Sequence, residues 1–159
     1  MAKKILLTGG TGYIGSHTAV ELIHQGYEVI IVDDLTNSEH RAIESIGKIT
    51  GTKPEFHKFD LRNFPSLEKL FKDNKFDGII HFAAKTAVGE SIEKPLLYYD
   101  VNLNSMLNLL KLMELHKVSN LVFSSSCTVY GQPSRLPVTE DTPFALAESP
   151  YGHTKQIGE

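Results

Sequence analysis

The sequence predicts an α/β fold in which a doubly wound parallel sheet is covered by helices on both faces. Short apolar runs recur along the chain, segments with helical spacing of apolar residues separate them, and a glycine cluster directly follows the first run. Strands that alternate with helices call for right-handed parallel crossovers. The expected strand order is therefore 3-2-1-4-5.

Each element follows from its local pattern. The apolar run at residues 4–8 predicts the first strand, and the glycines after it lead into a helix that carries Ile14 and Val20. Further strands are expected at 28–32, 55–59, 78–82 and 120–124, and further helices near 40–48, 65–72 and 96–116. Residues 131–150 are rich in proline and poor in periodic apolar positions, so a long loop is predicted there. Long loops inside compact domains are usually functional.

Composition excludes several classes of protein. At 159 residues, with 41% apolar and 22% charged residues, the chain can bury one core and is too short for two ordinary domains. The net charge is -3 and the basic residues are scattered, so no nucleic-acid partner is expected. No apolar stretch reaches the length of a signal-peptide core or a membrane span, which favours a cytoplasmic protein with no membrane partner. The single Cys127 excludes an intrachain disulfide, and the histidines have no metal-ligand spacing, so no metal site is predicted.

The glycine cluster at residues 9–15, "GGTGYIG", has the pattern of a dinucleotide-binding loop. Two overlapping spacings are present, one starting at Gly9 and one at Gly10, and both continue through Gly12 and Gly15. Glycines at these positions allow a tight turn, close approach of backbone N–H groups to a pyrophosphate and tight packing of the helix on the strand. The helix N-terminus adds partial positive charge for the phosphates. A phosphate-transfer loop is excluded, because no Gly-Lys-Ser/Thr follows.

Asp33 and Asp34 end the second predicted strand, where the adenosine ribose of a bound dinucleotide would lie. A carboxylate at this place accepts hydrogen bonds from the ribose hydroxyls and repels a 2′-phosphate. Because no arginine follows closely, the expected cofactor is NAD rather than NADP. The alternative is that both acids are solvated loop residues.

Tyr151 and Lys155, in "SPYGHTK", lie at positions i and i+4 and would share one face of a helix. A free tyrosine, with a pKa of about 10, is a poor base at neutral pH, and a neighbouring ammonium favours the charged phenolate. Lys155 would thus make Tyr151 a usable acid or base for a hydroxyl or carbonyl group. Alone, this spacing is common among surface residues, but beside an NAD loop it indicates hydride chemistry.

The segment "VFSSSCTVYG" supplies a third polar group. It lies at the carboxyl end of the fifth strand, beside the crevice where ligands bind in open α/β sheets. Ser126 is the predicted bridge between Tyr151 and a substrate oxygen. A serine that only caps or hydrogen-bonds the strand end would suit Ser124 or Ser125 better.

Together these motifs resemble the extended short-chain dehydrogenase/reductase superfamily and, within it, the UDP-glucose (UDP-galactose) 4-epimerase family. The similarity runs through "TGGTGYIGSHTAVEL", "DDLTNS", "HFAA", "AVGES", "KPLLYYD", "SSSCTVYG" and "SPYGHTK". It implies a Rossmann-type NAD-binding domain over residues 1–159 and interconversion of UDP-galactose and UDP-glucose in galactose metabolism. Tyr151 would take the proton of the sugar 4-hydroxyl while a hydride passes to NAD+. The hydride would return to the other face of the resulting 4-keto sugar.

The resemblance also implies individual contacts. Tyr151 would be the acid/base, Lys155 its partner and a ligand of the nicotinamide ribose, and Ser126 the contact to the substrate hydroxyl. The other cofactor contacts would be Gly9, Gly12, Tyr13, Ile14 and Gly15 at the pyrophosphate, Asp33, Asp34, Asn37 and Ser38 at the adenosine ribose, Asp60 and Leu61 at the adenine, and Phe82, Ala83 and Ala84 on the nicotinamide side.

Some positions depart from the family pattern or favour one member over another. Where lysine or serine is frequent the chain has Thr86, with Lys85 displaced by one, and Val101 stands where asparagine is frequent. A related sugar-nucleotide 4,6-dehydratase usually has Asp-Glu directly before "VYG", whereas this chain has Cys127 and Thr128, so elimination is disfavoured. Epimerases of UDP-N-acetylhexosamines or UDP-glucuronate remain alternatives.

The extended family normally continues for a comparable length with a smaller domain that binds the UDP-sugar. The sequence is therefore expected to be the N-terminal part of such an enzyme, truncated before the C-terminal substrate domain. It would bind NAD yet epimerise poorly or not at all by itself, and a non-catalytic NAD-binding module is the alternative. The leucines from Leu103 to Leu115 would pack in the core or support a homodimer.

Overall fold

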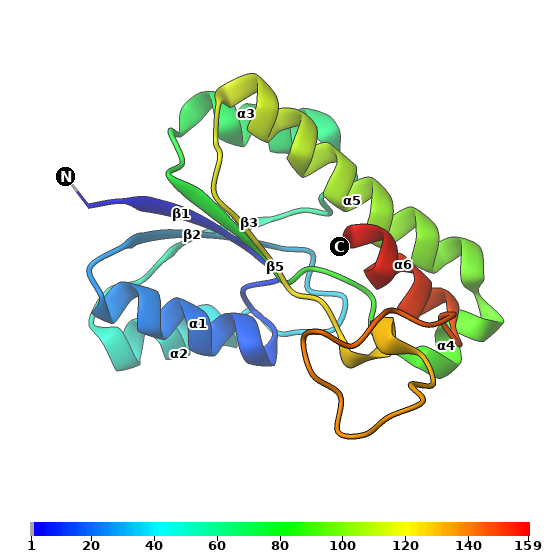
Figure 1. Ribbon diagram of the computed structural model, residues 1–159. Coiled ribbons are helices and arrows are strands. Elements are labelled where there is room, and N and C mark those ends of the chain that lie inside the picture. Colours follow the sequence, from blue (N-terminus) through cyan, green and yellow to red (C-terminus); the bar gives the residue numbers. More distant parts are fainter. Residues whose placement is uncertain (1) are drawn as a thin grey trace.

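The computed structural model describes residues 2–159 and shows a five-stranded parallel sheet covered by helices (Figure 1). The order β3-β2-β1-β4-β5, with parallel pairing throughout, confirms the predicted topology. The strands are β1 (Lys4–Thr8), β2 (Glu28–Asp33), β3 (Glu55–Lys58), β4 (Gly78–His81) and β5 (Leu121–Phe123). The helices are α1 (Tyr13–His24), α2 (Arg41–Thr50), α3 (Phe64–Asp73), α4 (Val88–Glu93), α5 (Pro95–His116) and α6 (Pro150–Gly158), with a 3-10 helix η1 (Cys127–Tyr130).

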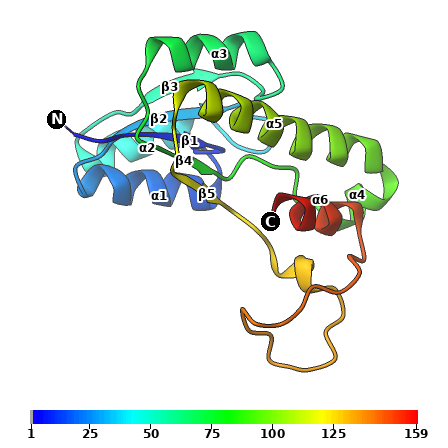
Figure 2. The ribbon, with the colours of Figure 1, turned by 45° about the horizontal axis from the view of Figure 1, so that its top comes forward.

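The central strands are apolar on both faces because helices cover both sides of the sheet. Leu6 and Ile30 pair in register and point into the core shared with α3 and α5. Their neighbours Leu7 and Ile31 point to the opposite core, beside α1 and α2. Figure 2 shows these two pairs of helices on opposite sides of the sheet. Such continuous apolar strands are typical of parallel sheets buried on both faces.

Two short elements lie where no regular structure was predicted. The six-residue α4 precedes α5, and Lys94 separates the two helices by leaving the helical region (φ -129°, ψ 57°). This break is expected, because the residue before a proline, here Pro95, disfavours helical backbone angles. The other short element, η1, follows β5 and begins after Ser126, which caps it.

The predicted long loop is confirmed, since residues 131–149 contain neither helix nor strand. Figure 2 shows this segment extending away from the sheet before it returns to α6. Ser149 caps α6 by accepting a hydrogen bond from the Gly152 N–H at 3.1 Å, and Pro150 occupies the first turn. The Gln156 amide donates to the carbonyls of Val129 (2.7 Å) and Ala145 (2.6 Å), which ties α6 to η1 and the loop.

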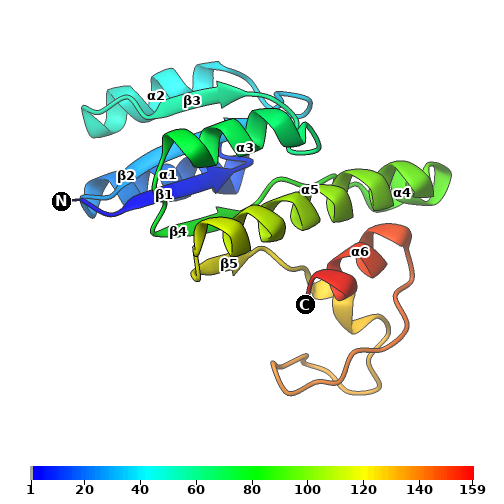
Figure 3. The same ribbon diagram turned by 90° about the horizontal axis from the view of Figure 1, so that it is seen from above.

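Helix α6 packs on α5 beyond the carboxyl ends of the strands (Figure 3). This position brings the last motif of the chain to the same edge of the sheet as the first. Across residues 2–159, no helix has both the length and the apolar character needed to cross a membrane.

Candidate active site

A cavity of about 620 Å³ lies at the carboxyl ends of the strands, where the loops that follow all five of them meet. Ligands bind at this edge in open α/β sheets. The cavity brings together every predicted cofactor contact: Gly9, Gly12, Tyr13, Ile14, Gly15, Asp33, Asp34, Asn37, Ser38, Asp60, Leu61, Phe82, Ala83, Ala84, Tyr151 and Lys155. Ser126 is not among the residues that line it.

The glycines of the first loop are required for different reasons. Gly9 has φ +69°, and a Cβ there would lie 2.6 Å from the Ala83 nitrogen. A Cβ at Gly15 would lie 2.2 Å from the Gly9 oxygen, whereas one at Gly12 would meet only that oxygen, at 3.4 Å. The fold therefore has room for a side chain at Gly12, and it is the cavity that would lose space. Gly10 does not line the cavity, so the spacing that starts at Gly9 describes the loop.

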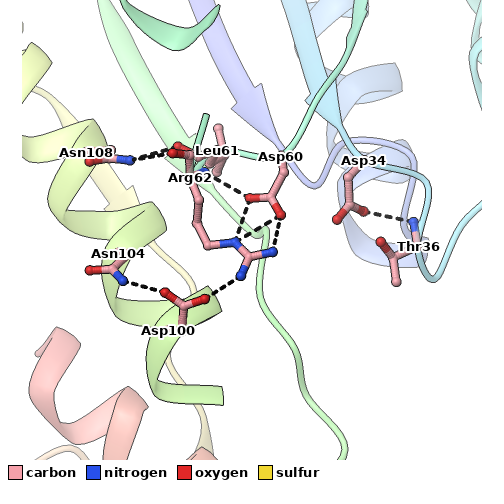
Figure 4. A network of polar contacts seen from close by, with 8 residues as sticks. All are labelled: Asp34, Thr36, Asp60, Leu61, Arg62, Asp100, Asn104 and Asn108. Carbon is pink, nitrogen blue, oxygen red and sulfur yellow. Dashed lines mark hydrogen bonds and ion pairs between the residues drawn. The ribbon is translucent and has the colours of Figure 1, made fainter. Parts of the chain in front are cut away.

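Asp33 and Asp34 lie in the cavity wall at the end of β2. Asp33 Oδ1 accepts a hydrogen bond from the Leu35 N–H at 2.9 Å. Figure 4 shows the corresponding bond of the next residue, in which Asp34 Oδ1 accepts from the Thr36 N–H at 2.8 Å. Arg41 lines a separate cavity between α1 and α2. Backbone donors thus hold two carboxylates at the place where a ribose hydroxyl or a 2′-phosphate would approach.

At the other end of the cavity, Tyr151 and Lys155 share one face of α6, and both side chains are buried. Lys155 Nζ lies 5.9 Å from the centre of the Tyr151 ring and 4.8 Å from that of Phe123. It donates a hydrogen bond of 2.7 Å to the Ser124 carbonyl oxygen. Burial lowers the pKa of Lys155 to about 8. The shared face was predicted from the spacing, and the chemical roles of the pair remain predictions.

His81 lies behind Lys155, at the end of β4. Its Nδ1 is 2.7 Å from Thr8 Oγ1, and its ring stacks on Phe123 with 6.1 Å between centres. Burial, together with the charge of Lys155, lowers the pKa of His81 to about 3. The imidazole is therefore neutral near pH 7, and it adds no positive charge beside the Lys155 ammonium.

The three adjacent serines after β5 take different positions from those expected: Ser126 caps the next element, and its two neighbours line the cavity. Ser126 Oγ accepts hydrogen bonds from the Thr128 N–H (3.3 Å) and hydroxyl (3.0 Å), so Ser126 is the capping serine. Ser124 and Ser125 both line the cavity, and the Ser124 N–H donates to the His81 carbonyl oxygen at 3.2 Å, at the end of β4. Ser125 Oγ is buried and has no hydrogen-bond partner within residues 2–159. A buried, unpaired hydroxyl costs about 1–3 kcal/mol, so this oxygen is suited to a ligand group.

Asn102, a buried side chain on α5, also belongs to the site, although it was not predicted from the sequence. Its Oδ1 accepts from the Lys85 N–H (2.8 Å), and its Nδ2 donates to the Lys85 carbonyl (3.1 Å) and to Thr154 Oγ1 (3.0 Å). Asn102 thus joins the loop after β4 to α6. Val101 and Thr86, the departures from the family pattern, line the cavity. An asparagine within the apolar stretch of a helix was the signal that could have identified Asn102.

Comparison with known proteins confirms the resemblance seen in the motifs. Residues 6–159 match the model of the GDP-mannose 4,6 dehydratase family. UDP-glucose 4-epimerase 2 of Arabidopsis thaliana is 49% identical over 158 residues, which cover 98% of this chain and 45% of the relative. UDP-glucose 4-epimerase of Dictyostelium discoideum is 51% identical over 152 residues, which cover 96% of this chain and 44% of the relative.

Solved structures agree with this assignment. The UDP-glucose 4-epimerase of Bifidobacterium longum, in complex with NAD+ and UDP, superposes with a TM-score of 0.96 at 46% identity, over 98% of this chain and 46% of that one. The enzyme of Stenotrophomonas maltophila, with bound NAD and formylated UDP-arabinopyranose, gives a TM-score of 0.93 at 45% identity, over 99% of this chain and 46% of that one. The chain spans about half the length of the curated relatives it matches. Because the family model covers residues 6–159, the chain belongs to the GDP-mannose 4,6 dehydratase family.

Proposed function

We propose that residues 1–159 form the NAD-binding part of a UDP-glucose 4-epimerase, an isomerase that interconverts UDP-galactose and UDP-glucose. The observation that carries this proposal is the single cavity that joins the glycine loop, Asp33 and the Tyr151–Lys155 pair. The relatives of about half identical sequence that bear this name support it. The Bifidobacterium longum neighbour, solved with NAD+ and UDP, supports NAD as the cofactor.

The residues that line the cavity fit a dinucleotide. Gly12 leaves space for a pyrophosphate to approach the backbone at the N-terminus of α1, and Asp33 offers a carboxylate to ribose hydroxyls. Ser125 offers a buried hydroxyl that lacks a partner within the described chain. When bound, NAD+ supplies a reversible acceptor for the two electrons that leave the sugar C4 position.

Tyr151 is the proposed acid and base of the reaction. Its oxygen takes the proton of the sugar 4-hydroxyl as C4 becomes a ketone. After the 4-keto sugar has rotated, the same oxygen gives the proton back. The Lys155 ammonium, held by the Ser124 carbonyl, favours the phenolate form of Tyr151 that is needed before the first proton transfer and restored after the second. The contact between Ser126 and the substrate hydroxyl is retained as a proposal.

The matching family is named after a dehydratase, yet the residues before "VYG" in this chain favour epimerisation. Elimination of water needs an acid and a base, and the two positions before "VYG" hold Cys127 and Thr128, neither of them carboxylic. The relatives named above are epimerases. Because the chain spans about 45% of such a relative, NAD binding is proposed for residues 1–159 and sugar turnover for a protein of the relatives' full length. The homodimer and the cytoplasmic location stay predictions.

The substitution Tyr151→Phe tests the proposed role in a protein of that full length. Removing the phenol oxygen takes away general acid–base catalysis, so turnover of UDP-galactose should fall by about 10²–10⁴-fold while the Kd for NAD+ stays within about threefold. Tyr130→Phe is the matched control, because Tyr130 packs on Phe144 and does not line the cavity. Turnover by Tyr151→Phe close to that of the control would contradict the assignment.

A further inference from the structure

Thr8, His81 and Phe123 form a row across the sheet at the edge that borders the cavity. Each is the last residue of its strand, and the three are paired in register on β1, β4 and β5. The His81 Nδ1 atom lies 2.7 Å from Thr8 Oγ1, and the His81 ring stacks on the Phe123 ring with 6.1 Å between centres. The row ends at Lys155, whose ammonium lies over the Phe123 ring, 4.8 Å from its centre.

The Phe123 ring is held by contacts with two other elements. The imidazole of His81 packs against it, and this imidazole is itself buried and bonded to the Thr8 hydroxyl. Helix α6 approaches the edge of the ring so closely that a Cβ at Gly158 would lie 2.5 Å from Phe123 Cζ. The ring therefore cannot turn away from Lys155 unless His81 or the end of α6 moves.

The partners that surround the Lys155 ammonium are uncharged. Its Nζ donates to the Ser124 carbonyl oxygen at 2.7 Å and lies over the Phe123 ring. The imidazole of His81 is neutral, because burial and the charge of Lys155 lower its pKa to about 3. A carboxylate partner would cancel much of the ammonium's field at Tyr151, whereas a ring face attracts a cation through its quadrupole and carries no net charge. The ring can thus stabilise the ammonium and leave its positive charge available to a phenolate.

No carboxylate of residues 2–159 lies within ion-pair distance of Lys155. On α6 itself, Tyr151 lies one turn before Lys155, and Glu159, one turn after it, is exposed. The charged and titratable groups on the elements packed against α6 have other contacts or are exposed: Tyr99 with His153, Glu90 with Tyr98, Lys85 and Lys94, Asp100 with Arg62, Tyr130 with Phe144, and the exposed Cys127. The charge of Lys155 in this chain therefore depends on its burial, the carbonyl oxygen and the ring.

We propose that Phe123 is a positioning residue whose ring face holds the Lys155 ammonium beside Tyr151 and favours its charged form. The inference rests on the proposed function, in which that ammonium supports the Tyr151 phenolate, and adds a further residue to it. The competing interpretation is that Phe123 is an apolar wall that only keeps water away from Lys155. The two differ in one measurable respect: the electron density of the ring face changes the titration of Lys155 only if the ring attracts the ammonium.

The test replaces Phe123 by a phenylalanine that is fluorinated at both meta carbons, in the NAD-free 159-residue chain. Fluorine withdraws electron density from the ring face and leaves the size of the ring nearly unchanged, whereas Phe123→Leu would also change the packing. The Lys155 titration is followed by NMR of isotopically labelled lysine, and Lys155→Met assigns its signal. The midpoint should fall by about 0.3 pH units or more, because the ammonium loses part of its attraction to the ring. The same fluorinated residue at Phe71 is the matched control, because Phe71 is buried against Phe76 in the core beside α3 and α5, and the midpoint should not change.

The second measurement is the pH profile of kcat for UDP-galactose in a protein of the relatives' full length. Turnover falls at alkaline pH when the ammonium loses its proton, so the alkaline limb of the fluorinated protein should move down by the same amount as the NMR midpoint. At lower pH, where Lys155 stays charged in both proteins, turnover should remain within about twofold. General damage to the structure would instead lower turnover at every pH alike.

The outcomes separate this inference from the proposed function. A Lys155 midpoint that stays unchanged or rises in the fluorinated chain would overturn the role of Phe123. A lower midpoint with an unchanged alkaline limb would also overturn it, since the ring would then stabilise the ammonium without serving Tyr151. A lower midpoint in a protein that does not turn over UDP-galactose would overturn the proposed function alone, because the NMR titration needs neither NAD+ nor a sugar nucleotide. If circular dichroism shows that the fluorinated chain does not fold, a ring with one meta fluorine provides the same comparison with a smaller change.

Discussion

The Lys155 ammonium is buried against a carbonyl oxygen and aromatic rings, and within residues 2–159 it has no carboxylate partner. Burial disfavours its charged form, which is why its pKa lies at about 8. His81 is held neutral behind it. The charge next to Tyr151 therefore comes from a group that titrates close to physiological pH. Because Lys155 lines the cavity, a charged ligand bound there would change its pKa.

The lowered pKa of Lys155 predicts how stability depends on pH. Between pH 8 and about 10.4 the unfolded chain holds a proton on this lysine that the folded chain lacks, so the free energy of unfolding should rise with pH in that window. The rise from this group is at most about 3 kcal/mol. Urea unfolding at pH 7.5 and pH 10 should show it in the unsubstituted chain and not in Lys155→Met.

Lys111→Met is the control for that comparison, because Lys111 is exposed on the same helix that packs against α6. Its pH dependence should match that of the unsubstituted chain. A Lys155→Met variant that keeps the full rise would show that the buried ammonium does not control stability in this range.

At the scale of elements, the strands and long helices were predictable because each carries a distinct pattern. Continuous apolar runs such as residues 28–32 indicate strands buried on both faces, and the Ser-Pro pair before Tyr151 indicates the start of a helix. The short α4 and η1 were missed because four to six residues are too few to show periodicity. These elements depend on packing rather than on local propensity.

The orientation of the three serines could not be predicted for a related reason. β5 ends at Phe123, so the alternation of side chains along a strand does not extend to Ser124, Ser125 and Ser126. The turn into η1 decides which hydroxyl faces the cavity, and that turn has no distinct sequence pattern. Asn102 was missed because its partners, Lys85 and Thr154, are distant in sequence and only the fold brings them together.

The glycine loop allows a prediction that separates folding from binding. Gly15→Ala should lower the free energy of unfolding by about 1–3 kcal/mol or more, because its Cβ would lie 2.2 Å from the Gly9 oxygen. Gly12→Ala should leave stability within about 1 kcal/mol, since its Cβ meets nothing closer than 3.4 Å, yet weaken NAD+ binding at least about tenfold. Thermal unfolding and NAD+ titration of both variants measure the two effects.

Gly89→Ala is the neutral control, since a Cβ there has nothing within 4 Å. Its NAD+ affinity should match that of the unsubstituted chain, and its free energy of unfolding should stay the same or rise by up to about 1 kcal/mol, because Gly89 lies in helix α4. NAD+ binding by Gly12→Ala as tight as in this control would mean that the loop does not approach a phosphate at that position.

For the whole molecule, the parallel topology is what assembles the site. The loops after all five strands meet at one edge of the sheet, so the first motif of the chain and the last share one cavity. Helix α5 crosses behind this edge and contacts both ends, through Asp100 at the Asp60–Arg62 segment and through Asn102 at α6. The strand order was predictable from the alternation of elements, but this bracing by polar side chains of α5 was not.

The amount of NAD(H) bound per chain shows whether residues 1–159 form an NAD-binding domain. The purified 159-residue chain is denatured, the released NAD(H) is quantified, and the refolded or ligand-free chain is titrated with NAD+ and NADP+. We expect about one NAD(H) per chain and binding of NADP+ at least about tenfold weaker, because Asp33 and Asp34 would repel a 2′-phosphate. A folded chain that binds no NAD(H), or that binds NADP+ equally well, would contradict it.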